Sequence, residues 1–205
     1  MSLADYNPEE FRTTNEAAKL LGVSPKTVQL WVESGVLRAW KTAGGHRRVT
    51  LDSIREVVAR REAAQAPPVG KARQLDLLVV DDEAPMRQLY EATLRTWDVP
   101  LNLRLAGDGF EGLVRIGERR PDCLITDLHM PGIDGFQMLR RLRDWPDLGG
   151  MSIVVVTGLN EDEIETAGGL PPGVTWLPKP VPFAQLRTWV GQQMQALGLA
   201  QPGVY

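Results

Sequence analysis

The C-terminal part of the chain alternates short apolar runs with longer segments of mixed polarity, and this alternation limits the possible folds more than any other feature. The first run, Leu75–Val80, is interrupted only by Asp76. Short runs without strict polar alternation are typical of parallel strands that are covered on both faces. Five such runs occur, separated by segments of helical length. We therefore expect an α/β domain with a five-stranded, doubly wound parallel sheet.

The expected elements lie between residue 75 and about residue 197. Strands are predicted at 75–80, about 101–105, 122–126, 151–156 and 174–177. Helices are predicted at about 84–97, from 107–109 to about 119, at about 135–144 and at about 182–197, with a weak helical segment before the fifth strand.

Chemically active side chains follow four of the five predicted strands. They are Asp81, Asp82, Asp127, Thr157 and Lys179. In doubly wound folds the ligand site lies at the carboxyl ends of the strands, so we expect these side chains to share one crevice. Clustered carboxylates repel each other unless a cation lies among them, and oxygen ligands without a thiolate suit Mg²⁺. Beside Mg²⁺, one carboxylate can attack phosphorus while a lysine and a hydroxyl stabilise the phosphoryl oxygens.

A simpler interpretation of these residues stays open. The aspartates and Thr157 can cap the helices that follow them, and Lys179 can be an exposed charge. Nucleotide hydrolysis is not indicated, because the sequence has no P-loop motif of glycine, lysine and serine or threonine.

The same residues stand in longer stretches that resemble the receiver domain of two-component response regulators. The matching stretches are 79–83, 122–135, 157–158 and 179–180, within about residues 75–197. The resemblance implies a flavodoxin-like α/β fold, and a regulator rather than an enzyme. We assign residues 75–205 to this domain.

The resemblance further implies a phosphoacceptor with a metal site beside it. Asp127 would accept a phosphoryl group from a histidine kinase. Asp82 and the backbone carbonyl of His129 would bind Mg²⁺ together with Asp127, and Asp81 would assist through water.

Three more residues would surround the phosphoryl group. The resemblance implies that Thr157 and Lys179 contact it, and Trp176 stands where the family places its switch aromatic, usually Tyr or Phe. A tryptophan after an apolar strand is often core packing, and that interpretation stays open for Trp176. The peptide between Lys179 and Pro180 is typically cis in the family, a form that proline makes accessible.

The first third of the chain differs in charge from the rest. Residues 1–66 carry ten basic and eight acidic side chains, a net charge of +2, against −5 for the remainder. This asymmetry indicates two modules with different partners. Because Pro67 and Pro68 cannot continue a preceding helix, we place a short linker at residues 67–74.

Two short helices joined by a tight turn are predicted near the start of the first module. Thr13 and Glu16 have the spacing of a capping box, and Gly22 suits the end of the first helix. Ser24 suits the N-cap of the second helix, with Pro25 at its first position. A hairpin from runs at 36–40 and 48–50 and a third helix from 51 or 52 to about 65 are expected next.

These elements resemble the winged helix-turn-helix of the MerR and excisionase type, over about residues 11–60. The wing Gly44–Arg48 is the most specific part of the resemblance. Residues 25–33 would present polar side chains to base edges, with Lys26, Thr27 and Gln29 pointing outward, while wing cations meet phosphates. The candidate DNA contacts are Lys26, Thr27, Gln29, Lys41, His46, Arg47 and Arg48. An isolated basic turn can equally be a solvated turn, and that alternative stays open.

Two features depart from the usual regulator of this kind. Residues 160–173 contain the adjacent pairs Gly168–Gly169 and Pro171–Pro172, so the helix there must be short or irregular. In many relatives the fourth helix, fifth strand and fifth helix pair two activated receivers, and that face is therefore in question here. The DNA-binding part also precedes the receiver, which is the reverse of the common order.

We expect a DNA-binding response regulator controlled by phosphorylation, with a histidine kinase and double-stranded DNA as partners. A short module contacts few base pairs, so a homodimer on adjacent half-sites is a possible assembly. A receiver-based protein adaptor and a constitutive, architectural DNA-binding protein are the alternatives.

The remaining composition favours a cytoplasmic protein with no membrane partner. Cys123 is the single cysteine and has no partner for an internal disulfide. Together with His46 and His129 it does not provide four ligands for structural zinc. The longest apolar runs fall far below the roughly 20 residues of a membrane span.

Overall fold

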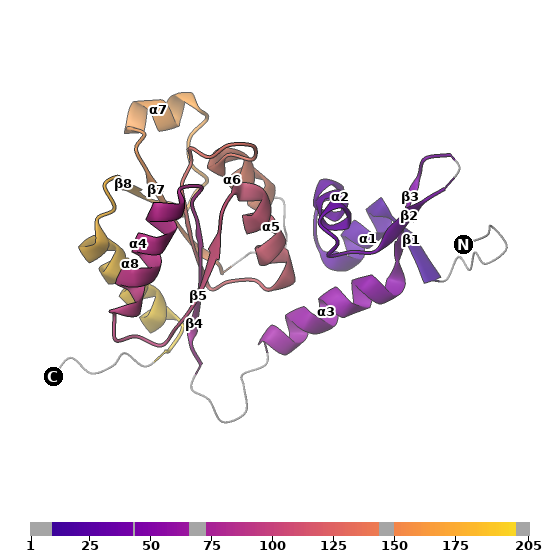
Figure 1. The fold of residues 1–205 in the computed structure, drawn as a ribbon, viewed down its shortest axis with the longest axis horizontal. Coiled ribbons are helices and arrows are strands. Elements are labelled where there is room, and N and C mark those ends of the chain that lie inside the picture. Colours follow the sequence, from indigo (N-terminus) through magenta and orange to yellow (C-terminus); the bar gives the residue numbers. More distant parts are fainter. Residues whose placement is uncertain (1–9, 43, 66–72, 144–149, 200–205) are drawn as a thin grey trace.

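The computed structural model describes residues 10–42, 44–65, 73–143 and 150–199, and it contains two modules (Figure 1). The larger module holds a five-stranded parallel sheet in the order β5-β4-β6-β7-β8. Its strands are β4 (Leu75–Val80), β5 (Leu101–Ala106), β6 (Cys123–Thr126), β7 (Ser152–Thr157) and β8 (Thr175–Pro178). The sheet reverses its winding between β4 and β6, and ligand sites lie at such a switch point. The predicted fold class is confirmed.

Helices cover both faces of this sheet (Figure 1). They are α4 (Ala84–Arg95), α5 (Gly109–Glu118), α6 (Gly135–Arg143), α7 (Glu161–Thr166) and α8 (Phe183–Ala196). Alternate residues of β4 divide the core, because Leu78 and Val80 pack with α5 and α6 while Leu77 and Val79 pack with α4 and α8. The strand is thus buried on both faces, as its uninterrupted apolar character predicts.

The helix in region 160–173 is short, as its sequence predicts. Helix α7 has six residues, and its N-cap Asn160 forms a reciprocal capping box with Glu163. Gly168 and Gly169 follow it with positive φ values, which end the helix.

The smaller module contains three helices and a three-stranded antiparallel sheet of order β1-β3-β2. Its elements are β1 (Phe11–Thr13), α1 (Thr14–Leu21), α2 (Pro25–Glu33), β2 (Ala39–Lys41), β3 (Arg47–Thr50) and α3 (Leu51–Gln65). Thr13 and Glu16 form the predicted capping box, and Gly22 ends α1 in the left-handed region. Ser24 caps α2 through the N–H of Thr27.

The small sheet of this module differs from its prediction in two respects. Strand β2 begins at Ala39, because Leu37 is buried and its N–H donates to the carbonyl of Trp31 at the end of α2. Strand β1 was not predicted at all, since three residues are too few to show an alternating pattern. It pairs Phe11 with Thr50 and ties the start of the module to the wing.

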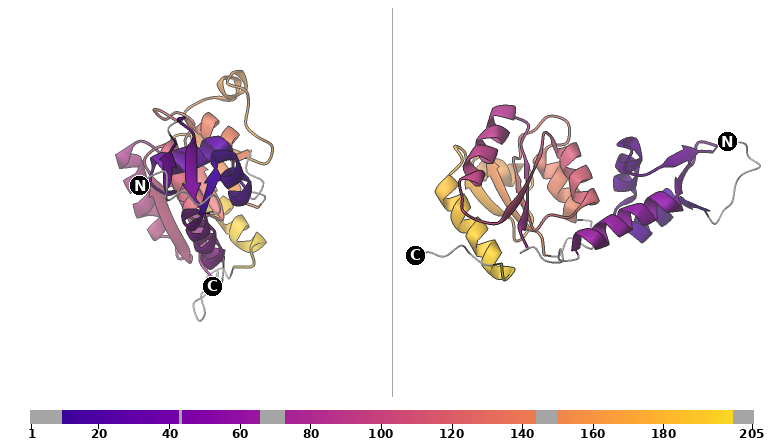
Figure 2. Two further views of the ribbon diagram at one scale, coloured as in Figure 1. Left: turned by 90° about the vertical axis from the view of Figure 1, so that its right-hand side faces the viewer. Right: turned by 60° about the horizontal axis from the view of Figure 1, so that its bottom comes forward.

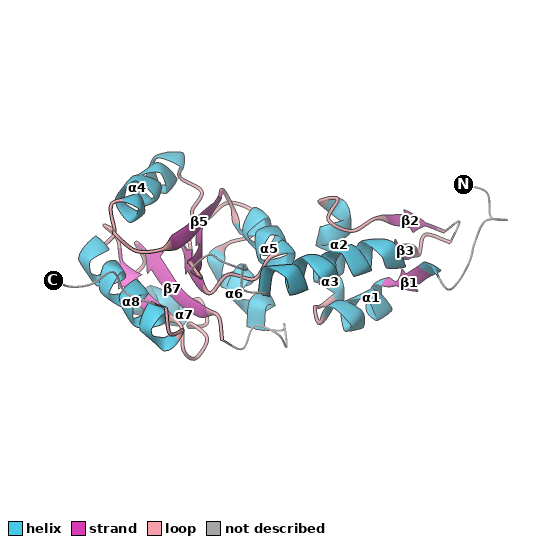
Figure 3. Cartoon of the chain, turned by 90° about the horizontal axis from the view of Figure 1, so that it is seen from below, coloured by secondary structure: helices cyan, strands magenta, loops and turns pink. Residues whose placement is uncertain are grey.

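The two modules are in contact through α5. Helices α2 and α3 both lie against α5 (Figures 1 and 3), and the apolar side chains on the two sides form one continuous cluster. The hairpin between β2 and β3 lies at the other end of the smaller module, away from the larger one (Figure 2). The predicted linker lies largely outside the described residues, and the exact domain boundaries stay a prediction.

Within the described part of the chain, no helix combines the length and the apolar character needed to cross a bilayer.

Candidate functional site

Lys179 links two buried carboxylates at the carboxyl edge of the parallel sheet. Its Nζ donates to Oδ2 of Asp127 at 2.7 Å and to Oδ2 of Asp81 at 3.3 Å. These side chains follow β8, β6 and β4, so the topology brings together residues far apart in sequence. Asp81 and Asp127 are buried and the lysine side chain is 17% exposed. The predicted convergence of these three side chains is therefore present.

The Asp127 carboxylate is fixed from two sides. Its Oδ1 accepts from the backbone N–H groups of Leu128 at 2.6 Å and His129 at 3.1 Å, while Oδ2 faces Lys179. Gly135 lets the chain return close to this point, since a Cβ there would overlap the backbone carbonyl of Asp127. An oriented carboxylate beside a cation has the placement that a nucleophile needs.

Burial makes the ionised form of Asp81 costly. It raises the pKa of that carboxyl, although the charge of Lys179 and the N–H of Glu83 act in the opposite direction. Burial lowers the pKa of Lys179 in turn, but the hydrogen bond and charge of Asp127, with the charge of Asp81, outweigh it and the pKa is raised. Two carboxylates thus share one ammonium, which leaves a net negative charge.

Thr157 and Trp176 lie at the ends of the neighbouring strands. Thr157 is fully buried at the end of β7, and its carbonyl accepts from the backbone N–H of Lys179 at 2.8 Å. Trp176 is partly buried and packs with Leu128 and Val155. Its indole Nε1 is buried without a hydrogen-bond partner among the described residues. The core-packing interpretation of Trp176 is present in the structure, and a switch role stays a prediction.

The acidic cluster is smaller than the sequence suggested. Among the described residues, no three acidic, imidazole or thiol side chains form a set that would hold a metal ion by themselves. Asp81 and Asp127 meet at Lys179. The backbone carbonyl of Asp82 accepts from Arg87, and its carboxylate is not a third member of that group. The side chain of His129 is exposed, and its N–H binds Asp127. Lys179 balances one of the two carboxylate charges, and the magnesium site stays a prediction.

Arg87 holds the acidic loop, a role that was not predicted from the sequence. One guanidinium nitrogen, Nη1, donates to the carbonyls of Asp81 and Asp82, both at 2.8 Å. The residue lies one turn into α4, where a basic side chain alone gives no distinctive signal. Its effect is to fix the backbone that carries both aspartates.

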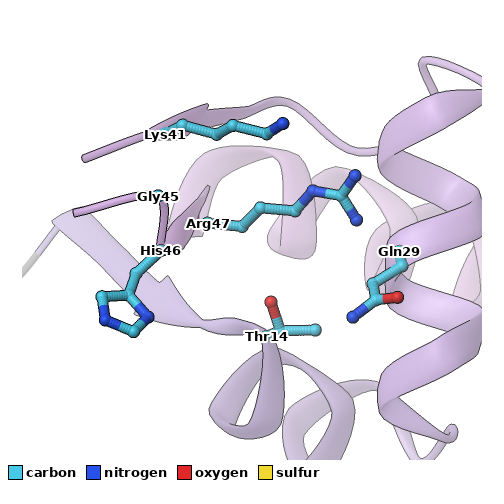
Figure 4. A pocket seen from close by; sticks show the side chains of 6 residues that line it. All are labelled: Thr14, Gln29, Lys41, Gly45, His46 and Arg47. Atoms are coloured by element: carbon cyan, nitrogen blue, oxygen red, sulfur yellow. The ribbon is translucent and has the colours of Figure 1, made fainter. Parts of the chain in front are cut away.

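A second site lies on the smaller module, where α2 faces the wing. A hollow of about 340 Å³ opens there, and Figure 4 shows its lining: Thr14, Gln29, Lys41, Gly45, His46 and Arg47. The lining brings together four of the seven candidate DNA contacts from α2 and the hairpin. The wing turn is shaped by Thr42, which binds His46 and Gly45 through its backbone and hydroxyl.

The other candidate contacts have different surroundings. Lys26 is exposed on α2, and Arg48 is half-buried opposite Trp40 and Thr13 in the small sheet. Arg47 forms an ion pair with Glu33 at 2.8 Å, so part of its charge is already balanced within the module.

The prediction that Thr27 points outward is wrong. The residue is 1% exposed, and its hydroxyl lies 2.9 Å from that of Ser24. The two hydroxyls satisfy each other at the start of α2, so Thr27 belongs to the helix cap and not to the outer surface.

The strand order, the acidic edge and the attached winged module define a class of protein, a receiver-type α/β domain joined to a helix-turn-helix. Comparison with known families agrees. Residues 77–190 match the response regulator receiver domain, and residues 13–62 match a helix-turn-helix domain. The first match covers more than half of the chain, so the chain belongs to the response regulator receiver family.

Individual relatives resemble mainly the larger module. The chain is 35% identical over 111 residues to the response regulator MprA of Mycobacterium avium (strain 104), which is 54% of this chain and 46% of that protein. It is 35% identical over 97 residues to the phosphate regulon transcriptional regulatory protein PhoB of Rhizobium meliloti (strain 1021), which is 47% of this chain and 41% of that protein. The chain thus spans less than half the length of these curated relatives.

A solved structure agrees with the fold of the larger module. The chemotaxis response regulator CheY4 of Vibrio cholerae has 26% identity and a TM-score of 0.50, covering 59% of this chain and 99% of that chain.

Proposed function

We propose that this chain is a DNA-binding response regulator that acts in the cytoplasm, in which a histidine kinase phosphorylates Asp127 and thereby changes the affinity of the winged module for double-stranded DNA. The observation that carries this proposal is the placement of Lys179 between Asp127 and Asp81, in a chain that also has a helix-turn-helix domain.

The chemistry at Asp127 is a phosphoryl transfer. A carboxylate oxygen attacks the phosphorus of a phosphohistidine, an O–P bond forms and the P–N bond breaks. The electron pair stays on the imidazole nitrogen, which takes a proton from water. The Leu128 and His129 N–H groups orient the carboxylate, and Lys179 and Thr157 would contact the transferred group.

Mg²⁺ is the cofactor of this proposal, and the donor set fits it. The available ligands are oxygens, and the paired carboxylates carry more negative charge than Lys179 balances. The residues that would hold the ion are Asp81, Asp82, Asp127 and the carbonyl of His129. When bound, Mg²⁺ neutralises charge on the phosphoryl oxygens. Arg87 supports the site by fixing the carbonyls of the two adjacent aspartates.

The hollow between α2 and the wing supports DNA as the ligand of the smaller module. Lys41, His46 and Arg47 surround it with exposed or half-exposed basic groups, and Gln29 adds an amide that can read base edges. Lys26 and Arg48 would add phosphate contacts at its sides. Two copies on adjacent half-sites would supply the affinity that one small module lacks.

Duplex binding with a phosphoryl mimic tests the whole proposal. The Kd of the full chain for a panel of duplexes is measured with and without beryllofluoride and Mg²⁺, for the wild type and for Asp127→Ala. We expect binding that weakens steeply with salt and a Kd that responds to the mimic in the wild type alone. Asp98→Ala, an exposed acid of the same domain, is the matched control and should respond like the wild type. Salt-independent binding or an equal response in Asp127→Ala would contradict the proposal.

A further inference from the structure

We propose that α5 is the output surface of the receiver domain, because it holds the second helix of the helix-turn-helix through Trp31 and carries changes at Asp127 to it. This inference rests on the proposed function for what is signalled. The docking itself is a separate, physical claim.

Trp31 fits against α5 at a position that has no side chain. The indole is fully buried, and a Cβ built on Gly117 would overlap its six-membered ring and lie 2.7 Å from Nε1. Gly117 is itself buried inside α5, where glycine is a poor helix former. The contact explains why a glycine occupies this place, since any larger residue would push Trp31 away.

The other end of α5 is packed just as closely against the segment that follows the phosphoacceptor. A Cβ on Gly109 would overlap the backbone carbonyl of Ile133, in the loop that leads from Asp127 to α6. One turn further, a Cβ on Gly112 would meet Val80 at 3.0 Å and Met138 at 3.1 Å. Movement of the Asp127 loop therefore acts directly on α5.

The guanidinium of Arg87 lies between the acidic loop and the start of the same helix. Arg87 binds the carbonyls of Asp81 and Asp82 and lies beside Gly107, whose N–H donates to Glu111 of α5 at 2.6 Å. Two independent connections, one apolar and one polar, thus run from the acidic edge to α5. The helix is short and tightly packed, so it transmits a displacement better than it absorbs one.

The docked arrangement leaves the candidate DNA surface open. Gln29, Lys41 and His46 are exposed and line the hollow (Figure 4), and the wing lies at the far end of the module from α5 (Figure 3). The contact is thus no steric block of the hollow. It sets the position of α2, and so the signal changes how the DNA surface is presented.

The substitution Gly117→Ala tests this inference in the full chain. Alanine is the better helix former, so the receiver fold is kept while the added methyl displaces Trp31. Glu118→Ala, at the next and exposed position of α5, is the matched control. Small-angle scattering reports whether the modules stay together, and the ratio of duplex Kd values without and with beryllofluoride reports coupling.

For the wild type and Glu118→Ala we expect the same compact scattering and a Kd ratio of at least about fivefold. For Gly117→Ala we expect a larger radius of gyration, unchanged phosphoryl labelling of Asp127 and a Kd ratio close to one. Unchanged scattering together with an undiminished ratio would overturn the inference. A larger radius of gyration of Gly117→Ala with an undiminished Kd ratio would overturn the signalling role of α5, while the docking of the smaller module on α5 would stand.

Failure of the proposed function has a different signature. If the wild type neither takes up phosphate nor binds a duplex, the proposed function is wrong, while the scattering difference still decides whether α5 docks the module. The double variant Trp31→Phe with Gly117→Ala adds a rescue test. Phenylalanine lacks the part of the indole that the methyl meets, so the pair should restore compact scattering.

Discussion

Lys179 donates a hydrogen bond of 2.7 Å to Asp127, which stands 52 residues earlier in the chain, and both groups are largely shielded from water. A cation and an anion in such surroundings depend on each other, because removal of one leaves the other buried without its counter-charge. This dependence makes the pair a sensitive probe of the acidic edge.

Lys179→Ala should destabilise the larger module. Asp127 and Asp81 would lose their shared ammonium, and we expect the free energy of unfolding at pH 7 to fall by about 3 kcal/mol. Urea denaturation followed by far-UV circular dichroism measures the difference. Lys179→Arg, which keeps the charge, should lose much less. Equal losses in the two variants would show that charge is not what matters.

The difference in free energy of unfolding between the wild type and Lys179→Ala should shrink at alkaline pH. The pKa of Lys179 is raised above its ordinary value of 10.5 in the folded protein. Its stabilising contribution is therefore complete below pH 10.5 and is lost as the pH rises through the raised pKa. The stability gap between the wild type and Lys179→Ala should stay constant from pH 7 to 10 and narrow above 10.5. A gap that widens on alkaline titration would contradict the assigned charge state.

Glu33→Gln should strengthen duplex binding. The substitution removes the carboxylate that pairs with Arg47 at 2.8 Å, so the guanidinium becomes free to meet a phosphate. We expect a lower Kd and a salt dependence steeper by about one unit of slope, as one additional phosphate contact gives. Glu56→Gln is the control, since it removes a comparable exposed ion pair, with Arg38. An identical salt slope in Glu33→Gln and the wild type would remove Arg47 from the interface.

Substitutions of Thr27 and Gln29 should have opposite effects on stability and on duplex binding, although both residues lie on α2. Thr27→Val removes a hydroxyl that faces Ser24 inside the module, so we expect about 1 kcal/mol less stability and little change in Kd. Gln29→Ala alters the wall of the hollow and should weaken duplex binding while stability is kept. Thermal melts and binding isotherms on the same samples check both. Weaker binding in a fully folded Thr27→Val would restore the outward interpretation of that residue.

Asp76→Asn should lower stability without affecting the acidic edge. Asp76 is buried near the amino end of β4 and accepts from Arg104 at 2.8 Å and Asn102 at 2.9 Å, with Arg119 also at 2.8 Å. The substitution leaves two guanidinium groups without their counter-charge and replaces one acceptor oxygen by an NH₂ group, and we expect a cost of about 3 kcal/mol. Phosphoryl labelling of the folded variant should match that of the wild type. Lost labelling in a folded sample would tie this end of the strand to the chemistry.

The strands and the acidic edge were predictable because each depends on local sequence. Leu75–Val80 is apolar enough to require burial on both faces, and parallel strands must end at the same edge. Asp81, Asp127 and Lys179 therefore had to meet. The local sequence does not show which side chains contact each other within the cluster. In the structure Lys179 bridges two carboxylates, and Asp82 does not join them as a third.

Long-range and marginal features were not predictable in the same way. Thr27 lies at the border of the buried face of α2, and the contact between its hydroxyl and that of Ser24 places it on the buried side. Strand β1 forms because β3 offers it a partner, not because three residues favour it. Gly117 carried a signal in retrospect, since a glycine within a helix costs stability unless close packing requires it. Its partner, Trp31, comes from the other module.

Phosphoryl uptake by Asp127 tests the central claim most directly. The purified full chain is incubated with a small-molecule phosphodonor and Mg²⁺, and intact-mass and peptide-level mass spectrometry locate the added group. We expect one phosphoryl group on the peptide that contains Asp127, absent when Mg²⁺ is chelated and absent from Asp127→Ala. Labelling that persists in Asp127→Ala, or a folded wild type that takes up none, would contradict the account.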